Sequence, residues 1–260
     1  MQLPIYQVDA FADTLFTGNP AAVCPLNSWL SDAQMQSIAT ENNLSETAFF
    51  VPEANHLHIR WFTPGAEVDL CGHATLATAH VLYTELGWDK SEIHFHCRKG
   101  TLRVQKTATG YAMDFPADTA IPTDIPVLVE QALGVRPLAF FHGSDDYLAI
   151  LENEEQVQNL QPDFRLVGKL KARGLLVSAI GDQHDFVSRG FFPQVGIDED
   201  PVTGSAHTLL TPYWAQRLGK NKLQARQISA RGGTLSCTLQ NDRVILEGTA
   251  QTYLKGTIYI

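Results

Sequence analysis

Two short glycine-containing turns are the places in this chain where residue types and spacing could hold a small anion. They are Cys71-Gly72-His73-Ala74 in the first half and Thr203-Gly204-Ser205-Ala206 in the second. A turn that opens directly into a helix presents backbone N–H groups and the positive end of the helix dipole. The pair therefore predicts two sites for a small carboxylate. In the alternative interpretation, each glycine only lets a helix begin against a closely packed strand.

Glu46 is the candidate for proton transfer. It lies in an expected strand over residues 45–51, where alternation puts it on the same face as Ala48 and Phe50. A carboxylate on an apolar face is expensive to ionise, which suits a group that must take a proton and return it. A solvated glutamate at a sheet edge is an equally good interpretation of the same pattern.

Two further polar residues stand beside the glycine turns. His73 lies in the first turn of an expected helix, where the helix dipole disfavours the imidazolium and favours a neutral ring that positions or shuttles a proton. Asp200 precedes Pro201, four residues before the second glycine. An aspartate at this place is also a common helix cap, so the sequence leaves both roles open.

The cysteines and histidines give no clear metal site. Cys71 stands where a helix N-terminus can lower a thiol pKa and produce a reactive thiolate, but its counterpart in the second half is Thr203. His94 and His96 share one face of an expected strand and Cys97 lies on the other, so these three do not converge on one ion. Nucleotide-binding motifs are absent near both turns. We expect neither a metal nor a cofactor.

The elements that must position these residues follow from an internal repeat. Four collinear blocks recur at offsets of 129 to 133 residues, about half the chain, which indicates two domains of similar fold facing a shared cleft. The matched blocks are Arg60-Trp61-Phe62-Thr63-Pro64 with Arg189-Gly190-Phe191-Phe192-Pro193, Gly72-His73-Ala74 with Gly204-Ser205-Ala206, Leu86-Gly87 with Leu218-Gly219, and Gly100-Thr101-Leu102 with Gly233-Thr234-Leu235.

Each half is predicted to be a curved sheet around one buried helix, an α+β fold. Residues 74–84 and 206–216 contain no charge, so both helices should be buried on nearly all sides. Surface helices are expected at 31–41 and 126–133. Short runs rich in β-branched and aromatic residues predict the strands: 45–51, 56–62, 93–97, 101–106 and 111–115, then 227–230, 234–239, 244–247 and 252–258.

The two domains are predicted to span residues 1–118 and 119–260. Three prolines and several short polar residues interrupt the pattern between positions 116 and 126, and the C-terminal strand may cross back to the first domain. The 260 residues comprise 28 acidic and 19 basic side chains, a net charge of −9 that disfavours nucleic acid and anionic membranes as partners. The N-terminus lacks a signal-peptide pattern, so we expect a soluble cytoplasmic protein with reduced cysteines.

Five segments together resemble the phenazine biosynthesis-like (PhzF) family. They are Gly18-Asn19-Pro20-Ala21-Ala22-Val23, Leu44-Ser45-Glu46-Thr47-Ala48-Phe49, Arg60-Trp61-Phe62-Thr63-Pro64, Cys71-Gly72-His73-Ala74-Thr75 and Glu199-Asp200-Pro201-Val202-Thr203-Gly204-Ser205-Ala206. The resemblance implies the diaminopimelate-epimerase fold, with two pseudo-symmetric domains, and commonly a homodimer. It also implies cofactor-independent isomerase chemistry.

Residue by residue, the resemblance implies a role for three side chains and two turns. Glu46 matches the general acid/base, and His73 and Asp200 match further catalytic residues. The two turns match the family's binding sites for the substrate carboxylate, at Gly72, Ala74, Thr203, Gly204, Ser205 and Ala206. Thr203 stands where related racemases have a second cysteine, which argues against a cysteine-pair mechanism. Two alternatives remain open: a lyase or hydrolase that depends on Cys71, and a metabolite-binding dimer without catalysis.

Overall fold

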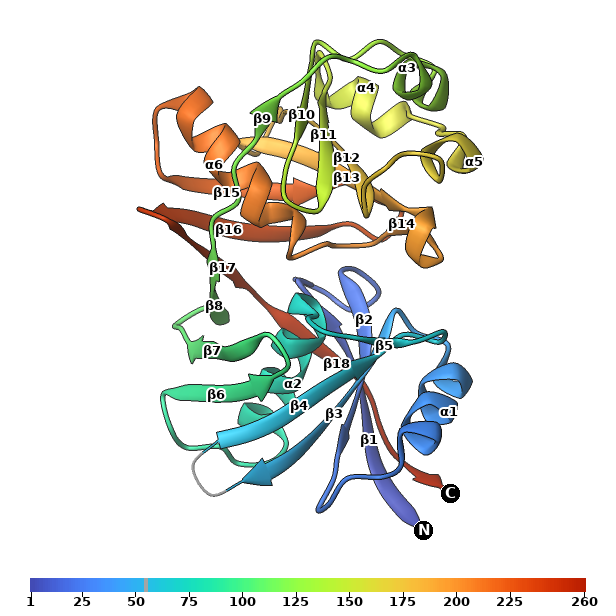
Figure 1. Ribbon diagram of the computed structural model, residues 1–260. Coiled ribbons are helices and arrows are strands. Elements are labelled where there is room, and N and C mark those ends of the chain that lie inside the picture. Colours follow the sequence, from blue (N-terminus) through green and yellow to red (C-terminus); the bar gives the residue numbers. More distant parts are fainter. Residues whose placement is uncertain (54–55) are drawn as a thin grey trace. The chain divides into compact units, whose positions relative to one another are not determined.

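The chain, described here from a computed structural model over residues 1–53 and 56–260, divides into two compact units (Figure 1). Unit 1 comprises Met1–Asp114 and Glu247–Ile260, and unit 2 comprises Phe115–Leu246. The last strand pairs antiparallel with the first along its whole length, with Tyr259 opposite Gln2. Because this pairing holds the C-terminal residues in unit 1, the chain passes between the units twice, after Asp114 and after Leu246.

In the described part of unit 1, nine strands accompany two helices (Figure 1). Its elements are β1 (Gln2–Ala10), β2 (Asn19–Pro25), α1 (Asp32–Asn42), β3 (Glu46–Glu53), β4 (His56–Phe62), β5 (Glu67–Val68), α2 (Gly72–Thr84), β6 (Glu92–Cys97), β7 (Gly100–Lys106), β8 (Tyr111–Pro116) and β18 (Ala250–Tyr259).

Unit 2 contains three short α-helices in addition to the long helix α6. Its elements are β9 (Ile121–Pro122), α3 (Val127–Leu133), β10 (Ala139–His142), β11 (Asp146–Ile150), α4 (Glu154–Asn159), α5 (Phe164–Val167), β12 (Gly174–Ile180), β13 (Phe186–Phe192), η1 (Pro193–Val195), β14 (Ile197–Asp200), α6 (Ala206–Leu218), β15 (Lys222–Gln227), β16 (Gly233–Gln240) and β17 (Arg243–Gly248).

The strands of the two units pair in the same order and directions. In unit 1, β1–β2 is antiparallel, β2–β3 parallel, β3–β4 antiparallel, β4–β6 parallel and β6–β7 antiparallel. In unit 2, the series β10–β11, β11–β12, β12–β13, β13–β15 and β15–β16 has the same alternation. The repeat in the sequence therefore corresponds to a repeat in topology.

One long apolar helix is buried in each unit, as the uncharged segments predicted. Helix α2 packs on β1, β2 and β3, and α6 packs on β15 and β16. Helix α2 begins at Gly72 itself, whereas α6 begins at Ala206, after a turn formed by Gly204 and Ser205. The prediction of a helix N-terminus is thus confirmed at Gly72 and shifted by two residues at the second turn.

The surface helices also follow the sequence prediction. Ser31 caps α1 in a capping box with Gln34, and Gly134 ends α3 in the left-handed conformation, with φ of 68°. The strand predicted at 227–230 is wrong, because β15 runs from Lys222 to Gln227. Its alternating residues Leu223 and Ala225 are buried, so the strand periodicity begins before the predicted segment.

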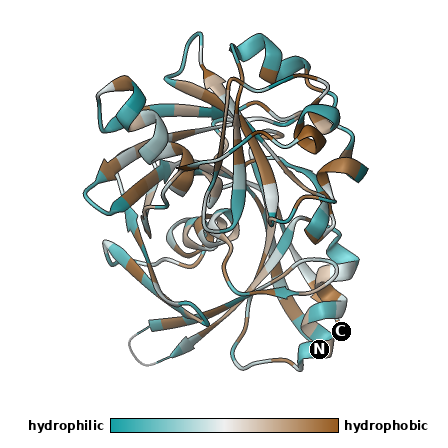
Figure 2. Cartoon of the chain, turned by 45° about the horizontal axis from the view of Figure 1, so that its top comes forward, coloured by the Kyte–Doolittle hydropathy of each residue, from teal (hydrophilic) through white to brown (hydrophobic). Residues whose placement is uncertain are grey.

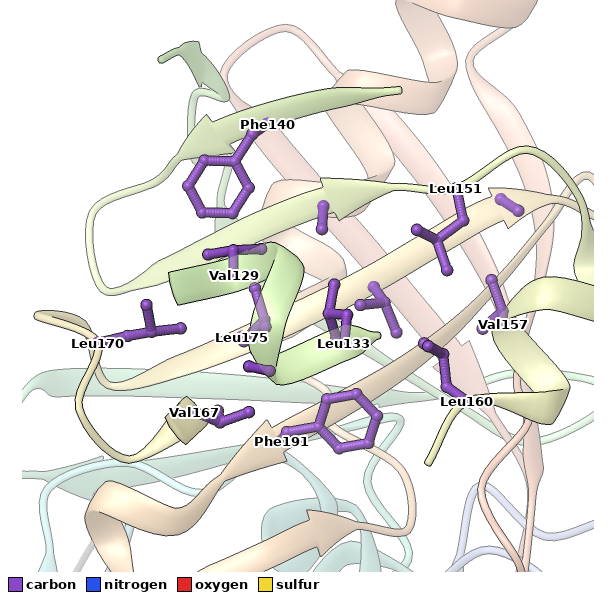
Figure 3. Packing of buried hydrophobic residues seen from close by; sticks show 14 of the residues in the cluster. Val129, Leu133, Phe140, Leu151, Val157, Leu160, Val167, Leu170, Leu175 and Phe191 are labelled. Carbon is purple, nitrogen blue, oxygen red and sulfur yellow. The ribbon is translucent and has the colours of Figure 1, made fainter. Parts of the chain in front are cut away.

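Two apolar clusters stabilise the outer layers. In unit 2, the helices α3, α4 and α5 bury Val129, Leu133 and Val157 against the strand residues Leu175 and Phe191 (Figure 3). In unit 1, α1 covers Phe49, Val51 and Phe62. Alternating hydrophobic and hydrophilic bands mark the outer strands (Figure 2). Among residues 1–53 and 56–260, no helix has the length and apolar character needed to cross a bilayer.

Candidate active site

Glu46 is the first residue of β3 and is nearly enclosed. It pairs with Ala21 across the parallel β2–β3 ladder, and its side chain is 12% exposed. Ala48 and Phe50, on the same strand face by alternation, are buried as well. The structure therefore supports the apolar setting expected for Glu46 rather than a solvated sheet edge.

His73, the second residue of α2, is the nearest partner of Glu46. Its Nε2 lies 2.9 Å from Oε2 of Glu46, and its side chain is 6% exposed. On the other side of the ring, Nδ1 lies 3.2 Å from the amide nitrogen of Asn19 and 3.6 Å from Sγ of Cys71. Four polar side chains from β2, β3 and the start of α2 thus meet inside unit 1.

The ionisation expected for His73 is corrected by this geometry. Burial lowers the pKa of His73, but the interactions of its ring with Cys71 and with the Glu46 carboxylate oppose burial and raise the pKa well above its usual value. We expected a neutral ring because the helix dipole disfavours a cation. A carboxylate at 2.9 Å outweighs the half charge of a helix end.

The prediction of a reactive thiolate at Cys71 is also corrected. Burial, with a smaller contribution from Glu46, raises its pKa to about 11. The thiol is therefore protonated at neutral pH, and Glu46 is the negative charge that His73 faces. A helix N-terminus lowers the pKa of an accessible thiol, but this one is enclosed and lies beside a carboxylate.

The same three side chains also form a group that could hold a cation. Within the described residues, Glu46, Cys71 and His73 offer donor atoms that lie within 4.8 Å of one another. A carboxylate, a thiolate and an imidazole are ligands that zinc accepts. To bind a metal here, the thiol would first have to lose its proton.

In unit 2, Asp200 belongs to a network that holds the second turn. Thr203 donates its hydroxyl hydrogen to Oδ2 of Asp200 at 2.5 Å. Gln227, which is 1% exposed, accepts from the backbone N–H of Thr203 at 2.8 Å and donates to the carbonyl of Asp200 at 2.7 Å. Asp200 is therefore not the side-chain cap of α6, whose N-cap residue is Ser205.

Asp146, the first residue of β11, and Arg173, which directly precedes β12, support the turn. Arg173 donates through Nε to Asp146 at 2.9 Å and through a terminal nitrogen to the Ser205 hydroxyl at 3.0 Å. Burial lowers the pKa of Arg173, but its hydrogen bond and charge interaction with Asp146, with a smaller contribution from Asp200, raise it overall. An arginine that is paired with Asp146 thus lies next to the second turn.

Three of these residues were missed as functional candidates from the sequence. Asn19 lies within one of the segments that carry the family resemblance, but nothing in the pattern assigned it a role. Gln227 stands 24 residues beyond Thr203, and Arg173 stands 32 residues before Ser205. No short motif spans such separations, so only the fold brings these residues together.

The chain is similar to known proteins in both sequence and fold. A model of the phenazine biosynthesis-like protein family matches residues 8–256. The chain belongs to the phenazine biosynthesis-like family. A member described as an uncharacterized isomerase of Pseudomonas aeruginosa is 50% identical over 260 residues, covering 100% of both chains. Similarity to relatives of this kind over the full length places the chain among the isomerases.

Solved structures of the phenazine biosynthesis-like family show the same fold. One from Enterococcus faecalis has a TM-score of 0.97 and 48% identity, and each chain is covered completely. A hydroxyproline epimerase from Agrobacterium vitis has a TM-score of 0.66 at 9% identity, over 99% of this chain and 92% of that one. The mixed, strand-rich architecture is therefore shared with epimerases, at an identity that indicates the fold alone.

Proposed function

We propose that this protein moves a proton between carbon atoms of a small carboxylic acid, with Glu46 as the general acid/base. The observation that carries the proposal is the contact between the enclosed Glu46 carboxylate and His73 at 2.9 Å. A carboxylate fixed by one partner keeps a second oxygen for a substrate proton. The same residues match the family positions that the sequence resemblance identified.

The reaction is balanced without a further reactant. Glu46 takes a proton from a carbon next to an unsaturated or carboxylate group, and the electron pair of that C–H bond moves into the conjugated system. The carboxylic acid so formed returns the proton to another carbon. His73, whose pKa is raised, keeps Glu46 oriented through the 2.9 Å contact. Asp200 assists from the second turn.

The substrate carboxylate is proposed to bind the backbone N–H groups of the two glycine turns. At the first turn these belong to Gly72 and Ala74. At the second, Gln227 already occupies the N–H of Thr203, which moves the proposed contact to Gly204, Ser205 and Ala206. Arg173 adds a positive charge there. The matching strand order of the two units supports the expectation of two related epimerase-like domains.

The Cys71-dependent alternative has less support, because a thiol with a pKa of about 11 is a poor nucleophile at neutral pH. Alkylation of the protein distinguishes the two mechanisms. On alkylation, an enzyme that depends on Cys71 should lose all activity. In a Cys71→Ala variant, an enzyme that depends on Glu46 should retain its activity. A metabolite-binding protein without catalysis would bind ligands and never exchange a substrate hydrogen.

The experiment that tests the proposal is a screen of small carboxylic acids in deuterated water, followed by NMR. We expect deuterium to enter one substrate carbon with the native chain. In Glu46→Gln the substrate should still bind, while turnover falls by roughly 100-fold or more. Glu41→Gln, an exposed substitution on α1, is the matched control and should behave as the native chain.

His73→Ala and Asp200→Asn should reduce both binding and turnover, because each side chain supports a turn that is proposed to hold the substrate. Isothermal titration with the same acid separates binding from turnover. Undiminished binding in both variants would contradict the proposed roles of the turns.

We also propose that the chain forms a homodimer, as the family resemblance implies. Light scattering after size exclusion should give twice the 28.7 kDa of one chain. A mass of 28.7 kDa at micromolar concentration would contradict this.

A further inference from the structure

Unit 1 carries two His-x-His sequences on neighbouring strands, outside the site described above. They are His56-Leu57-His58 on β4 and His94-Phe95-His96 on β6. The strands pair in parallel, with Leu57 beside Phe95 and His58 beside His96. Since Leu57 and Phe95 are buried, the four histidines all lie on the opposite sheet face. Neighbouring histidines there are about 7 Å apart along a strand and about 5 Å apart across it.

A carboxylate lies among these histidines. Glu53 is opposite His56 in the antiparallel β3–β4 pair and so shares its face. One Glu53 oxygen is 2.7 Å from Nε2 of His56, and the other is 3.4 Å from Nδ1 of His58. The His56 ring also stacks on the His96 ring, with 3.7 Å between centroids and 18° between planes. His56 therefore links Glu53 to the second strand.

We propose that Glu53, His56, His58 and His96 form a surface site for one zinc-class divalent cation. Imidazole nitrogen and carboxylate oxygen are the donors that zinc prefers beside thiolate, at about 2.0 to 2.2 Å. Donor atoms around one such ion are separated by about 3.3 Å, close to the separations already present between Glu53 and its two histidines. His96 is exposed and His56 and His58 are half-buried, so the His56 and His96 rings would rotate out of their stack to bring the remaining nitrogens to the same ion.

The reason that sequence analysis missed this set is that it considered only the histidines and cysteine of β6. Those side chains do not converge by themselves, and β4 supplies the other ligands. The site is also separate from the catalytic carboxylate. Glu46 and Glu53 stand at opposite ends of β3, seven residues and about 23 Å apart. A bound ion would connect β3, β4 and β6 and stabilise this end of the sheet.

Titration with Zn²⁺ tests the proposal. The starting protein is Cys71→Ala, which removes the competing donor set beside Glu46. Isothermal titration calorimetry in a non-coordinating buffer should give one ion per chain. In thermal unfolding, the midpoint should rise with Zn²⁺ concentration. Adding His56→Gln or His58→Gln should weaken binding at least tenfold. Adding His142→Gln, an exposed histidine on β10 of unit 2, is the matched control and should change nothing.

Several results would overturn the proposal. These are the absence of saturable binding, equal affinities in the His58→Gln and His142→Gln proteins, or binding that disappears with His73→Gln. A second measurement remains informative if a histidine variant unfolds. The Trp29 ring lies 5.2 Å from that of His58, so Cu²⁺ should quench its fluorescence in the otherwise native chain. An identical quench in Trp29→Phe would place the ion elsewhere.

Discussion

Each unit buries a histidine in the first turn of its long helix, and the two histidines have opposite electrostatics. In unit 1, His73 faces the Glu46 carboxylate, and its pKa is raised well above the usual value. In unit 2, His207 faces only the Thr203 carbonyl through Nδ1 at 2.8 Å, and burial lowers its pKa to about 4. The second residue of each long helix therefore has a raised pKa beside an acid in unit 1 and a lowered pKa in the core of unit 2, although the sequence repeat matches His73 with Ser205 and not with His207.

The difference comes from one strand position. Glu46 opens β3, and the register of the strand pairs makes Gly174, the first residue of β12, its counterpart. A Cβ atom on Gly174 would lie 2.2 Å from a ring carbon of Phe192. Unit 2 has no room for a side chain there. Repetition of the fold has thus preserved the scaffold while the proposed acid/base is present in unit 1 alone.

A feature shared by both units gives the largest expected effect on stability. Arg60 and Arg189 occupy matched positions, and each donates two hydrogen bonds to a glutamate, Glu67 or Glu199. Arg189 also donates to the carbonyl of Leu160 at 2.8 Å, and its side chain is 10% exposed. Arg189→Met should therefore lower the free energy of unfolding by about 3 to 5 kcal/mol.

Arg60→Met should cost less, about 1 to 3 kcal/mol, because Arg98 still pairs with Glu67 at 2.6 Å. Urea unfolding measures both variants. Arg165→Met, where the side chain is 89% exposed, is the control and should change little. Equal losses for the two buried arginines would contradict the greater dependence of unit 2 on its ion pair.

Acid should expose the contrast between the two histidines. The unfolded chain binds a proton at His207 near pH 6.5, whereas the folded chain resists protonation until about pH 4. Stability therefore falls as pH decreases through this window, by about 3 kcal/mol in total. His207→Gln should remove this part of the pH dependence in urea unfolding. An unchanged slope between pH 6.5 and 4.5 would contradict the burial of a neutral ring.

A substitution at Gly174 tests why unit 2 lacks the acid. Gly174→Ala should destabilise the chain by about 1 to 3 kcal/mol, because Phe192 must move to admit the methyl group. Thermal unfolding measures the effect. Gly134→Ala would be strained by its positive φ, so Gly65→Ala is the better control, with open space around its Cβ position. A stable Gly174→Ala protein would mean that space does not exclude a side chain from this strand position.

The smallest expected change is spectroscopic. In Glu46→Gln the pKa of His73 should fall, because burial then acts without the carboxylate that opposes it. Two-dimensional NMR of the imidazole ring measures the titration. Because the pKa of His73 is higher in the folded chain than in the unfolded chain, its contact with Glu46 stabilises the native fold fully at pH values below the pKa of the unfolded chain. This contribution is lost as the pH rises through the pKa of His73 in the folded chain. An unchanged His73 titration in the variant would remove Glu46 as the cause.

Much of the scaffold was predictable because its signals are local. The uncharged runs predicted α2 and α6, the capping residues predicted α1 and α3, and strand alternation placed Glu46 on an apolar face. The repeat predicted matching units, and the structure shows the matching strand order. Strands whose burial is not periodic, such as β12 and β13, gave no comparable signal because every position except Ile180 is buried.

The electrostatics of the site depended on contacts that no local pattern encodes. His73 was expected to be neutral because the helix end was visible in the sequence and the distance to Glu46 was not. Cys71 was expected to be a candidate thiolate because burial around it comes from other elements. Gln227 was placed at the start of a strand that in fact ends there, which hid its bonds to the Asp200 segment.

Solvent deuterium exchange in three proteins tests the central claim, that Glu46 moves the substrate proton. With a turned-over carboxylic acid, the native chain and Cys71→Ala should both introduce deuterium at the substrate carbon, while Glu46→Gln should not. If Glu46→Gln exchanged deuterium at the native rate and Cys71→Ala did not, proton transfer would belong to the thiol, and the proposed role of the carboxylate would be wrong.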